Sequence, residues 1–406
     1  MSSRREFVGN VAAMIGAAGV PGTSVPAAAQ SEWAGADSGS LFPFIASQPP
    51  AVPELSWLRP EFRDLRAWKR RARARLLSLL HYAPPKCPPD PEVILTLDRG
   101  DHILEYVRFN TTPSIRVPAF VLVPKHARLP APGVVNLHDH GAFFMWGKEK
   151  LVELPDENPA LTAFRRTSYD DRSTAVELCR RGYVVIVADM FYWGERRMLL
   201  DQDPADWRDR PASMSAERVA AFNARSSASA PMVNNTIQTA GLTWAGIMLW
   251  DDIRTVDYLA SRPDVDARRI ACVGLSVGGF RSCHLAALDD RIKAAVVVGW
   301  MTSFPEQIKN HVRWTIGETM LIPGLYKSLD YPDVAAMAAP TPMLVINGSR
   351  DTLFAPKGVN AAFDKLAAAW QKAGAPQKIR TRWYDTPHEF NSRMQQEAWE
   401  WLARWL

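Results

Sequence analysis

The chain has 406 residues, of which 47% are hydrophobic and 22% charged, the balance of an ordinary globular protein with a large core. The net charge of +5 is small, and basic residues gather only over residues 63–75, as the solvent face of one helix, which argues against a nucleic-acid partner. Four cysteines without a C-x-x-C pair argue against a zinc site or a disulfide scaffold.

The first 29 residues are typical of a twin-arginine signal peptide. Arg4-Arg5 follow a serine and stand two places before Phe7, a mildly apolar stretch covers residues 11–20, and Ala27-Ala28-Ala29 offers small residues for cleavage. The apolar stretch is too short to span a membrane, and no second one follows, so stable membrane insertion is not expected. We therefore expect export by the twin-arginine route to the periplasm or the extracellular space.

Residues 30–56 are small, polar and rich in proline, which indicates a linker. A catalytic domain is expected over 57–406, and it begins with a helical extension at 57–90. The extension contains a helix from Trp57 to His81, and two proline pairs end it. Three β-rich segments, 93–97, 102–109 and 117–123, then predict antiparallel strands.

From Pro132 onward strands and helices alternate, which predicts a mostly parallel central sheet with helices on both faces, an α/β fold. Residues 300–335 lie between two strands, show little periodicity, and are expected to form a lid segment. Strands are predicted at 133–137, 183–188, 270–275, 294–298, 343–347 and 379–384, and helices near 172–181, 240–261, 277–288, 357–373 and 391–406.

The chain is organised around the sequence G-L-S-V-G-G at residues 274–279. It follows an apolar strand and precedes a helical pattern, the context of a nucleophile elbow. The turn lifts the Ser276 hydroxyl above the sheet, and glycines at 274 and 278 avoid collisions with neighbouring strands and helices. The helix N-terminus then points its free N–H groups at a reacting carbonyl.

A serine nucleophile needs an imidazole to take its proton and a carboxylate to orient that imidazole. Downstream of Ser276, Asp351 follows the strand at 343–347, and His388 follows the strand at 379–384. The chain order Ser, Asp, His is that of α/β-hydrolases. Asp385 and Glu389 are rival acids, but both stand too close to His388 in sequence to reach its ring from a separate strand end.

The oxyanion hole requires two N–H donors aimed at the developing negative charge. The N–H of Val277, directly after the nucleophile, is one candidate, and the N–H of His140, in the loop after the strand at 133–137, is the other. The sequence His138-Asp139-His140 also suggests metal ligands, but no further histidine or acid is placed to complete a site. We expect neither a metal nor an organic cofactor.

With these residues in place, the chain resembles secreted serine esterases of the α/β-hydrolase superfamily, of the acetyl xylan esterase-like and dienelactone hydrolase-like kind. The resemblance covers the chain from about Trp57 to its C-terminus and implies hydrolysis of an ester, a small acyl group on a carbohydrate or similar alcohol. It rests on H-D-H-G at 138–141, G-K-E at 147–149, D-M-F-Y-W-G-E-R at 189–196, W-D-D at 250–252 with Arg254 and D-Y-L at 257–259, and T-P-H-E-F-N at 386–391.

Two departures from the family pattern bear on the substrate. Ser276 stands where dienelactone hydrolases carry cysteine, which disfavours lactone opening, and Val277 replaces the glutamine of many sugar deacetylases. Trp146, Trp193 and Trp300 are the tryptophans nearest the predicted site and are candidates for a sugar-binding pocket.

Three alternatives remain beside this interpretation. A serine peptidase of the prolyl oligopeptidase type shares the elbow and the triad order, but the chain has no room for the usual propeller. A hydrolase of other small esters or lactones is a second alternative. A catalytically silent binding protein of the same fold is expected to lose a triad member, and Ser276, Asp351 and His388 are all present.

Cys272 and Cys283 flank the elbow and are the obvious disulfide pair in an exported protein. A helix axis lies on the order of 10 Å from its neighbours, whereas a disulfide needs Cα atoms closer than about 7 Å. We therefore expect both thiols to stay reduced in the core.

Overall fold

The structure, a computed structural model, describes residues 33–406, without the side chains of Arg313 and Trp314. The predicted signal peptide at 1–29 lies outside the described residues. The chain divides into two units, with the boundary between Gln48 and Pro49. The described part of the first unit contains a 3-10 turn, η1 (Gly39–Leu41), and a short helix, α3 (Phe42–Ser47).

The larger unit begins earlier than the predicted linker allows. Leu55 is buried and its N–H donates to the Ser328 carbonyl at 2.8 Å. The Ser56 hydroxyl donates to Asp333 Oδ1 at 2.8 Å. The last residues of the predicted linker at 30–56 are therefore part of the larger unit, held by hydrogen bonds that small polar composition does not reveal.

The predicted helix of the 57–90 extension is shorter than expected. Helix α4 spans Leu65–Leu80, because the side chain of Asp64 caps its N-terminus by accepting from the N–H groups of Arg66 and Ala67. The apolar residues before Asp64 pack as turns instead, and Trp57 is buried against Trp68, with ring centroids 5.0 Å apart.

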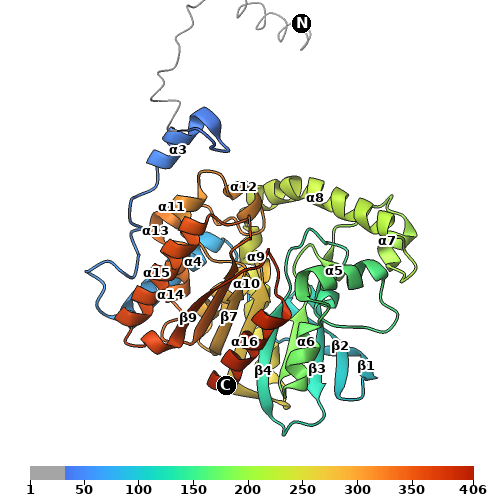
Figure 1. Ribbon diagram of the computed structural model, residues 1–406. Coiled ribbons are helices and arrows are strands. Elements are labelled where there is room, and N and C mark those ends of the chain that lie inside the picture. Colours follow the sequence, from blue (N-terminus) through green and yellow to red (C-terminus); the bar gives the residue numbers. More distant parts are fainter. Residues whose placement is uncertain (1–32) are drawn as a thin grey trace, which may run out of the picture. The chain divides into compact units, whose positions relative to one another are not determined.

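A nine-stranded sheet forms the centre of the larger unit (Figure 1). Its order is β1-β2-β3-β5-β4-β6-β7-β8-β9; β1, β2 and β3 pair antiparallel, β3 pairs antiparallel with β5, and the other pairs are parallel. The prediction of a mostly parallel sheet with antiparallel N-terminal strands is confirmed. The strands are β1 (Glu92–Asp98), β2 (His102–Thr112), β3 (Ile115–Pro124), β4 (Ala131–Leu137), β5 (Val184–Ala188), β6 (Val265–Leu275), β7 (Ile292–Val298), β8 (Met343–Gly348) and β9 (Ile379–Tyr384).

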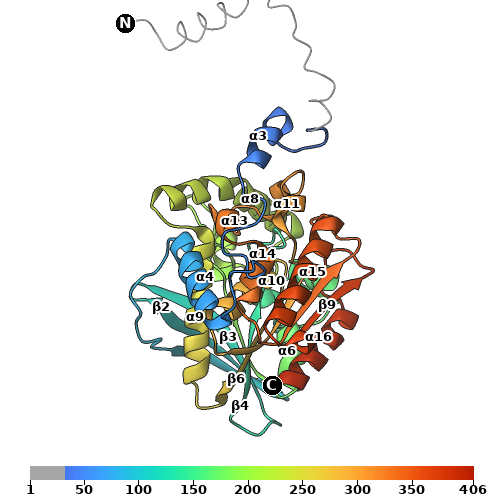
Figure 2. The same cartoon turned by 90° about the vertical axis from the view of Figure 1, so that its left-hand side faces the viewer.

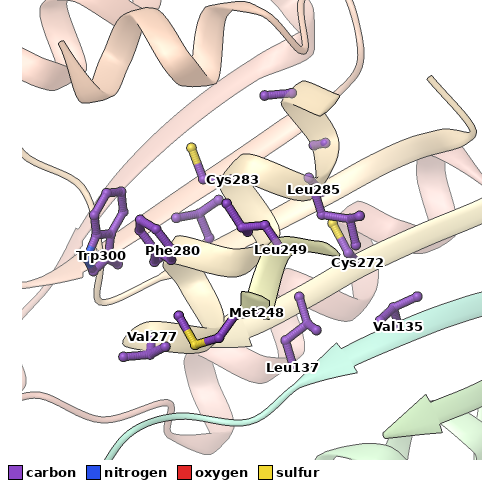
Figure 3. Packing of buried hydrophobic residues seen from close by; sticks show 14 of the residues in the cluster. Val135, Leu137, Met248, Leu249, Cys272, Val277, Phe280, Cys283, Leu285 and Trp300 are labelled. Atoms are coloured by element: carbon purple, nitrogen blue, oxygen red, sulfur yellow. The ribbon is translucent and has the colours of Figure 1, made fainter. Parts of the chain in front are cut away.

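Helices cover both faces of this sheet, as Figures 1 and 2 show. Neighbouring side chains on each strand enter opposite layers: Val134 joins the layer with α6 and α16, and Val135 joins the layer with α4, α9, α10, α14 and α15. Figure 3 shows part of the second layer, where Val135 and Leu137 lie near side chains of α9 and α10. The helices are α6 (Thr174–Arg180), α9 (Trp244–Ser261), α10 (Val277–Leu288), α14 (Tyr331–Ala336), α15 (Pro356–Lys372) and α16 (Ser392–Trp405).

Several elements escape the sequence prediction. Helix α8 (Ala216–Thr239) contains Pro231, a residue that normally ends a helix. The others are short or border loops: η2 (Lys148–Lys150), α5 (Pro159–Tyr169), η3 (Gly194–Arg196), α7 (Ala205–Asp209) and η4 (Pro376–Lys378). Over residues 33–406, the structure contains no helix with the length and apolar character needed to cross a membrane.

The predicted lid segment at 300–335 divides into a part with short helices and a part that is buried. Its first part holds the short helices α11 (Phe304–Gln307), α12 (Val312–Thr315) and α13 (Leu325–Ser328). From Leu329 onward the chain is buried, and α14 packs between α10 and α15 in the core. The final residues of the segment are therefore part of the packed core, and the lid stays a prediction.

The cysteines are free thiols, as predicted. Cys272 on β6 and Cys283 on α10 both lie in the hydrophobic cluster of Figure 3, and the Cys272 thiol donates to the Ser282 carbonyl at 3.4 Å. Burial raises the pKa of the Cys283 thiol to about 12, so it stays protonated and behaves as a small apolar side chain.

Candidate active site

Ser276 stands between β6 and α10 with a strained backbone. Its φ is 59° and its ψ is −121°, values that cost a residue with a side chain about 1–3 kcal/mol. The Ser276 N–H donates to the Val298 carbonyl of β7 at 2.8 Å, which fixes the turn. The surroundings hold this conformation in place, as the nucleophile-elbow prediction requires.

The glycines of the elbow are needed for close approach. A Cβ on Gly274 would lie 2.4 Å from the Gly278 carbonyl carbon, and a Cβ on Gly278 would lie 2.0 Å from the Leu137 carbonyl oxygen. Both neighbours are backbone atoms that cannot move aside. The close approach brings the elbow against the end of β4, where Leu137 pairs with Gly274.

Asp351 and His388 meet beside the elbow. His388 Nδ1 lies 2.6 Å from Asp351 Oδ2, and Asp351 Oδ1 accepts the Leu353 N–H at 3.0 Å. The pairing of β8 with β9 continues past the strand ends, because the Arg350 N–H donates to the Thr386 carbonyl at 3.1 Å. This pairing brings together two residues that are 37 positions apart.

The two rival acids point elsewhere. Asp385 is 86% exposed at its side chain and pairs with Arg350 at 3.0 Å. Glu389 Oε1 accepts hydrogen bonds from the Thr386 hydroxyl and from Asn391 Nδ2. Of the three candidate carboxylates, Asp351 alone is within hydrogen-bond distance of the His388 ring.

A cavity of about 220 Å³ contains Ser276 and His388. In the part of the chain that the structure describes, His388 Nε2 has no hydrogen-bond partner, so this nitrogen is available to accept a proton. A Cβ on Gly299 would lie 3.1 Å from His388 Cε1, so this glycine makes room for the imidazole. The cavity is lined by the loop after β4, by the elbow, and by the segments after β7, β8 and β9. The lining residues are His140, Gly141, Ala142, Ser276, Val277, Trp300, Thr315, Gly317, Thr319, Met320, Leu353, Phe354 and His388.

The loop after β4 brings His140 to this cavity beside Val277. The ring of His140 stays neutral near pH 7, because burial and the nearby Lys150 lower its pKa to about 4. Its Nδ1 accepts the Ala142 N–H at 2.9 Å, and this bond stabilises a turn in which Gly141 and Ala142 both have positive φ. The predicted oxyanion residues therefore share one cavity with Ser276 and His388, while Asp351 contacts His388 from outside its lining.

His138 is held as a structural residue. Its Nε2 accepts the Met190 N–H at 3.1 Å, and its Nδ1 faces the Asp139 carbonyl at 3.0 Å. Burial, with Lys150 and Arg281 nearby, lowers the pKa of His138 well below its usual range. Because both ring nitrogens have protein partners, His138 is a poor metal ligand.

A buried acidic cluster lies beneath the same loop. Glu149, Asp189 and Glu195 have carboxylate oxygens close enough to share a cation. The Lys148 ammonium occupies this position, at 3.1, 2.9 and 2.5 Å from the three carboxylates. Burial opposes the charge on Lys148, but the three carboxylates outweigh it and raise its pKa above the ordinary value. The cluster is an internal ion-pair network.

The three candidate pocket tryptophans differ in position. Trp193 is 0% exposed and belongs to an aromatic cluster with Phe144 and Trp244. Trp146 is also buried, packs on Phe143, and does not line the cavity. Trp300 does line it, and within residues 33–406 its indole N–H has no acceptor. The sequence did not indicate the cap residues Thr315, Thr319 and Met320, which follow no motif.

The strand order, the helices on both faces and a serine elbow between β6 and α10 define an α/β-hydrolase fold. Residues 54–402 match the Abhydrolase family, and the chain belongs to it. The predicted superfamily is thereby confirmed.

Known proteins of similar sequence and structure agree with this assignment. YtaP of Bacillus subtilis (strain 168), named as a hydrolase, is 27% identical over 334 residues, which cover 82% of this chain and 98% of that protein. A Bacteroides fragilis structure described as an acetyl xylan esterase has a TM-score of 0.65 at 18% identity and covers 86% of this chain and 82% of its own. The glucuronoyl esterase from Solibacter usitatus has a TM-score of 0.58 at 14% identity, over 88% of this chain and 98% of its own. At these identities the two structures establish the fold.

Proposed function

We propose that the protein is a serine ester hydrolase that removes a small acyl group from a carbohydrate or similar alcohol through an acyl-enzyme. The observation that carries this proposal is the placement of His388. Its Nδ1 contacts Asp351, its Nε2 has no partner among residues 33–406, and His388 lines the cavity that also holds the strained Ser276.

In the proposed reaction, His388 accepts the hydroxyl proton as Ser276 attacks the acyl carbon. Asp351 holds the imidazole in the tautomer with its proton on Nδ1 and stabilises the imidazolium. The backbone N–H groups of Val277 and His140 bind the oxyanion. The imidazolium then gives its proton to the departing alcohol, and a water molecule completes the cycle by the same route.

The size of the cavity supports a small acyl group. About 220 Å³ is less than the usual range of ligand pockets, and Trp300, Met320 and Phe354 form bulky walls. We expect hydrolysis of nitrophenyl acetate to exceed hydrolysis of the octanoate by at least about 10²-fold in kcat/KM, because a long chain cannot enter without displacing a wall. Met320→Ala should lower the ratio of acetate to octanoate hydrolysis, because the smaller side chain opens the wall and raises kcat/KM on the octanoate. Equal rates on the two esters in the unmodified enzyme would contradict a small acyl site.

Turnover of three further kinds of substrate separates the alternative functions. Acetylated xylan tests a carbohydrate alcohol, a glucuronoyl ester tests the activity named for the Solibacter usitatus protein, and aminoacyl nitroanilides test a peptidase. The carbohydrate deacetylase proposal expects turnover of acetylated xylan and none of the nitroanilides.

We also propose that the protein is exported by the twin-arginine route, on the sequence of its first 29 residues. Replacing Arg4-Arg5 with two lysines should leave the protein in the cytoplasm with its signal intact, because the paired arginines are the recognised element. Cell fractionation and the mass of the mature N-terminus measure this outcome. Normal processing of the double-lysine variant would exclude the route.

A further inference from the structure

Lys150 is a buried cation outside the groups used in the proposed reaction. Its side chain is 0% exposed, and its ammonium donates to the carbonyl oxygens of Asp139 at 2.9 Å and His140 at 3.0 Å. A third contact is the ion pair with Asp139 Oδ2 at 3.5 Å. Two of the three contacts are therefore to consecutive peptide carbonyls of the loop after β4.

Two other buried side chains donate to carbonyls of the same loop. The indole N–H of Trp193 donates to the His140 carbonyl at 3.1 Å. Arg281 on α10 donates to the His138 carbonyl at 3.4 Å and forms a two-pronged ion pair with Asp252 on α9. The carbonyls of residues 138, 139 and 140 thus all have a buried donor.

Holding the carbonyls fixes the N–H groups as well. In a trans peptide the N–H points opposite to the carbonyl of the same plane. The cis peptide bonds in residues 33–406 are both X-Pro bonds outside this loop. Because Lys150 binds the carbonyls of Asp139 and His140, the N–H groups of His140 and Gly141 in the same peptide planes point away from the Lys150 ammonium. His140 and Gly141 line the cavity that contains Ser276.

We propose that Lys150 is a positioning residue for the oxyanion hole: by binding the carbonyls of Asp139 and His140, its ammonium aims the N–H groups of His140 and Gly141 at the substrate carbonyl oxygen. This proposal rests on the proposed function, because an oxyanion forms only if Ser276 attacks an ester. Trp193, which the sequence predicted as a pocket residue, would then have a different role, because its indole N–H also binds the His140 carbonyl.

The charge of Lys150 is sensitive to pH near the working range. Burial, opposed by Asp139, lowers the pKa of the Lys150 ammonium to about 8. Below pH 8 the ammonium has three donors for its three contacts, and above pH 8 the neutral amine has two. The loop therefore loses a contact as pH rises. The titratable groups that face Lys150 or its partner carboxylate are Asp139, His138, His140, Glu149, Asp189 and Tyr169.

Lys150→Met tests the proposal, with Tyr169→Phe as its matched control. Methionine keeps the length of the side chain and removes the donors. The Tyr169 hydroxyl donates to Asp139 Oδ1 at 2.6 Å and touches no loop carbonyl, so its loss disturbs the same buried carboxylate alone. We expect kcat of Lys150→Met on nitrophenyl acetate to fall by about 10²-fold with KM nearly unchanged, since one misaligned oxyanion donor costs this much. Tyr169→Phe should keep the wild-type kcat.

A tetrahedral inhibitor adds a measurement that a purely structural role would not move. A trifluoromethyl ketone that adds to Ser276 places an oxyanion in the hole, so its affinity for Lys150→Met should fall by the same factor as kcat/KM. In the wild type, kcat should decline above about pH 8, and in Lys150→Arg the decline should move to higher pH because arginine keeps its charge. The wild-type profile needs no variant to fold.

The outcomes separate this inference from the proposed function. A wild type that hydrolyses no ester and takes no fluorophosphonate label at Ser276 removes the proposed function. An active, labelled wild type whose Lys150→Met variant keeps full kcat and full inhibitor affinity overturns the role of Lys150 alone.

Discussion

Ser276→Ala is expected to lower kcat/KM on nitrophenyl acetate by about 10⁴-fold or more, because it removes the atom that would form the acyl-enzyme. The fold should be unaffected. Alanine tolerates the same strained φ of 59° as serine, and the lost hydroxyl lies at the cavity rather than in the core. A fluorophosphonate should label the wild type and leave the variant unlabelled, and circular dichroism should show equal melting curves.

Ser282→Ala is the matched control for this variant. Ser282 lies on the same helix α10, is fully buried, and its hydroxyl has no partner among residues 33–406. Full activity is expected there. Ser276→Gly adds a second check, since glycine accepts a positive φ without strain and should abolish activity while keeping or raising the melting temperature. Substantial turnover by Ser276→Ala would remove the elbow assignment.

The parallel sheet could be predicted because its strands have strong local signals. The segments that became β4 to β8 are short apolar runs, the one that became β9 is a run of alternating apolar and polar residues, and the structure places a strand at each of them. The order of the elbow, Asp351 and His388 along the chain was equally visible, because each residue follows such a run. Parallel strands end at one edge, so strand ends in the sequence become neighbours in space.

Helix α8 shows why other elements were missed. Half of its buried face consists of a serine, an alanine and an asparagine, since the buried residues are Val219, Phe222, Ser226, Ala230, Asn234 and Ile237. Pro231 stands within the helix and normally signals its end. Only packing against the rest of the molecule stabilises such a helix, and packing is not a local property. Helix α5 had a usable signal, since Asn158 caps it and Pro159 takes its first position.

The parts of the candidate site that sequence reasoning missed depend on tertiary contacts. Lys150 follows the G-K-E sequence by one residue, and nothing local distinguishes it from Lys148, yet one binds loop carbonyls and the other binds carboxylates. The cap residues around Thr315 and Met320 approach Ser276 only because the segment after β7 returns over the strand ends. A buried cation is identified by its partners, and those lie on other segments.

Asp351→Asn is expected to lower kcat by about 10⁴-fold while leaving the fold intact, the loss typical of a triad whose histidine is held in the wrong tautomer. The Leu353 N–H donates to Oδ1 at 3.0 Å, so asparagine keeps its carbonyl oxygen there and turns its NH₂ toward His388. The NH₂ is a donor, whereas the carboxylate oxygen at 2.6 Å is an acceptor. His388 Nδ1 must then accept, its proton moves to Nε2, and Nε2 can no longer take the proton of Ser276.

The rival acids supply the controls for this prediction. Asp385→Asn changes an exposed carboxylate that forms an ion pair with Arg350. Glu389→Gln changes a carboxylate that accepts hydrogen bonds from Thr386 and Asn391. Both variants should keep activity within a few-fold of the wild type, because neither group reaches the His388 ring. The measurement is kcat for the three variants beside their thermal melts. If Asp385→Asn or Glu389→Gln loses far more activity than Asp351→Asn at equal stability, the orienting acid is not Asp351, and the contact between Asp351 and His388 serves structure instead.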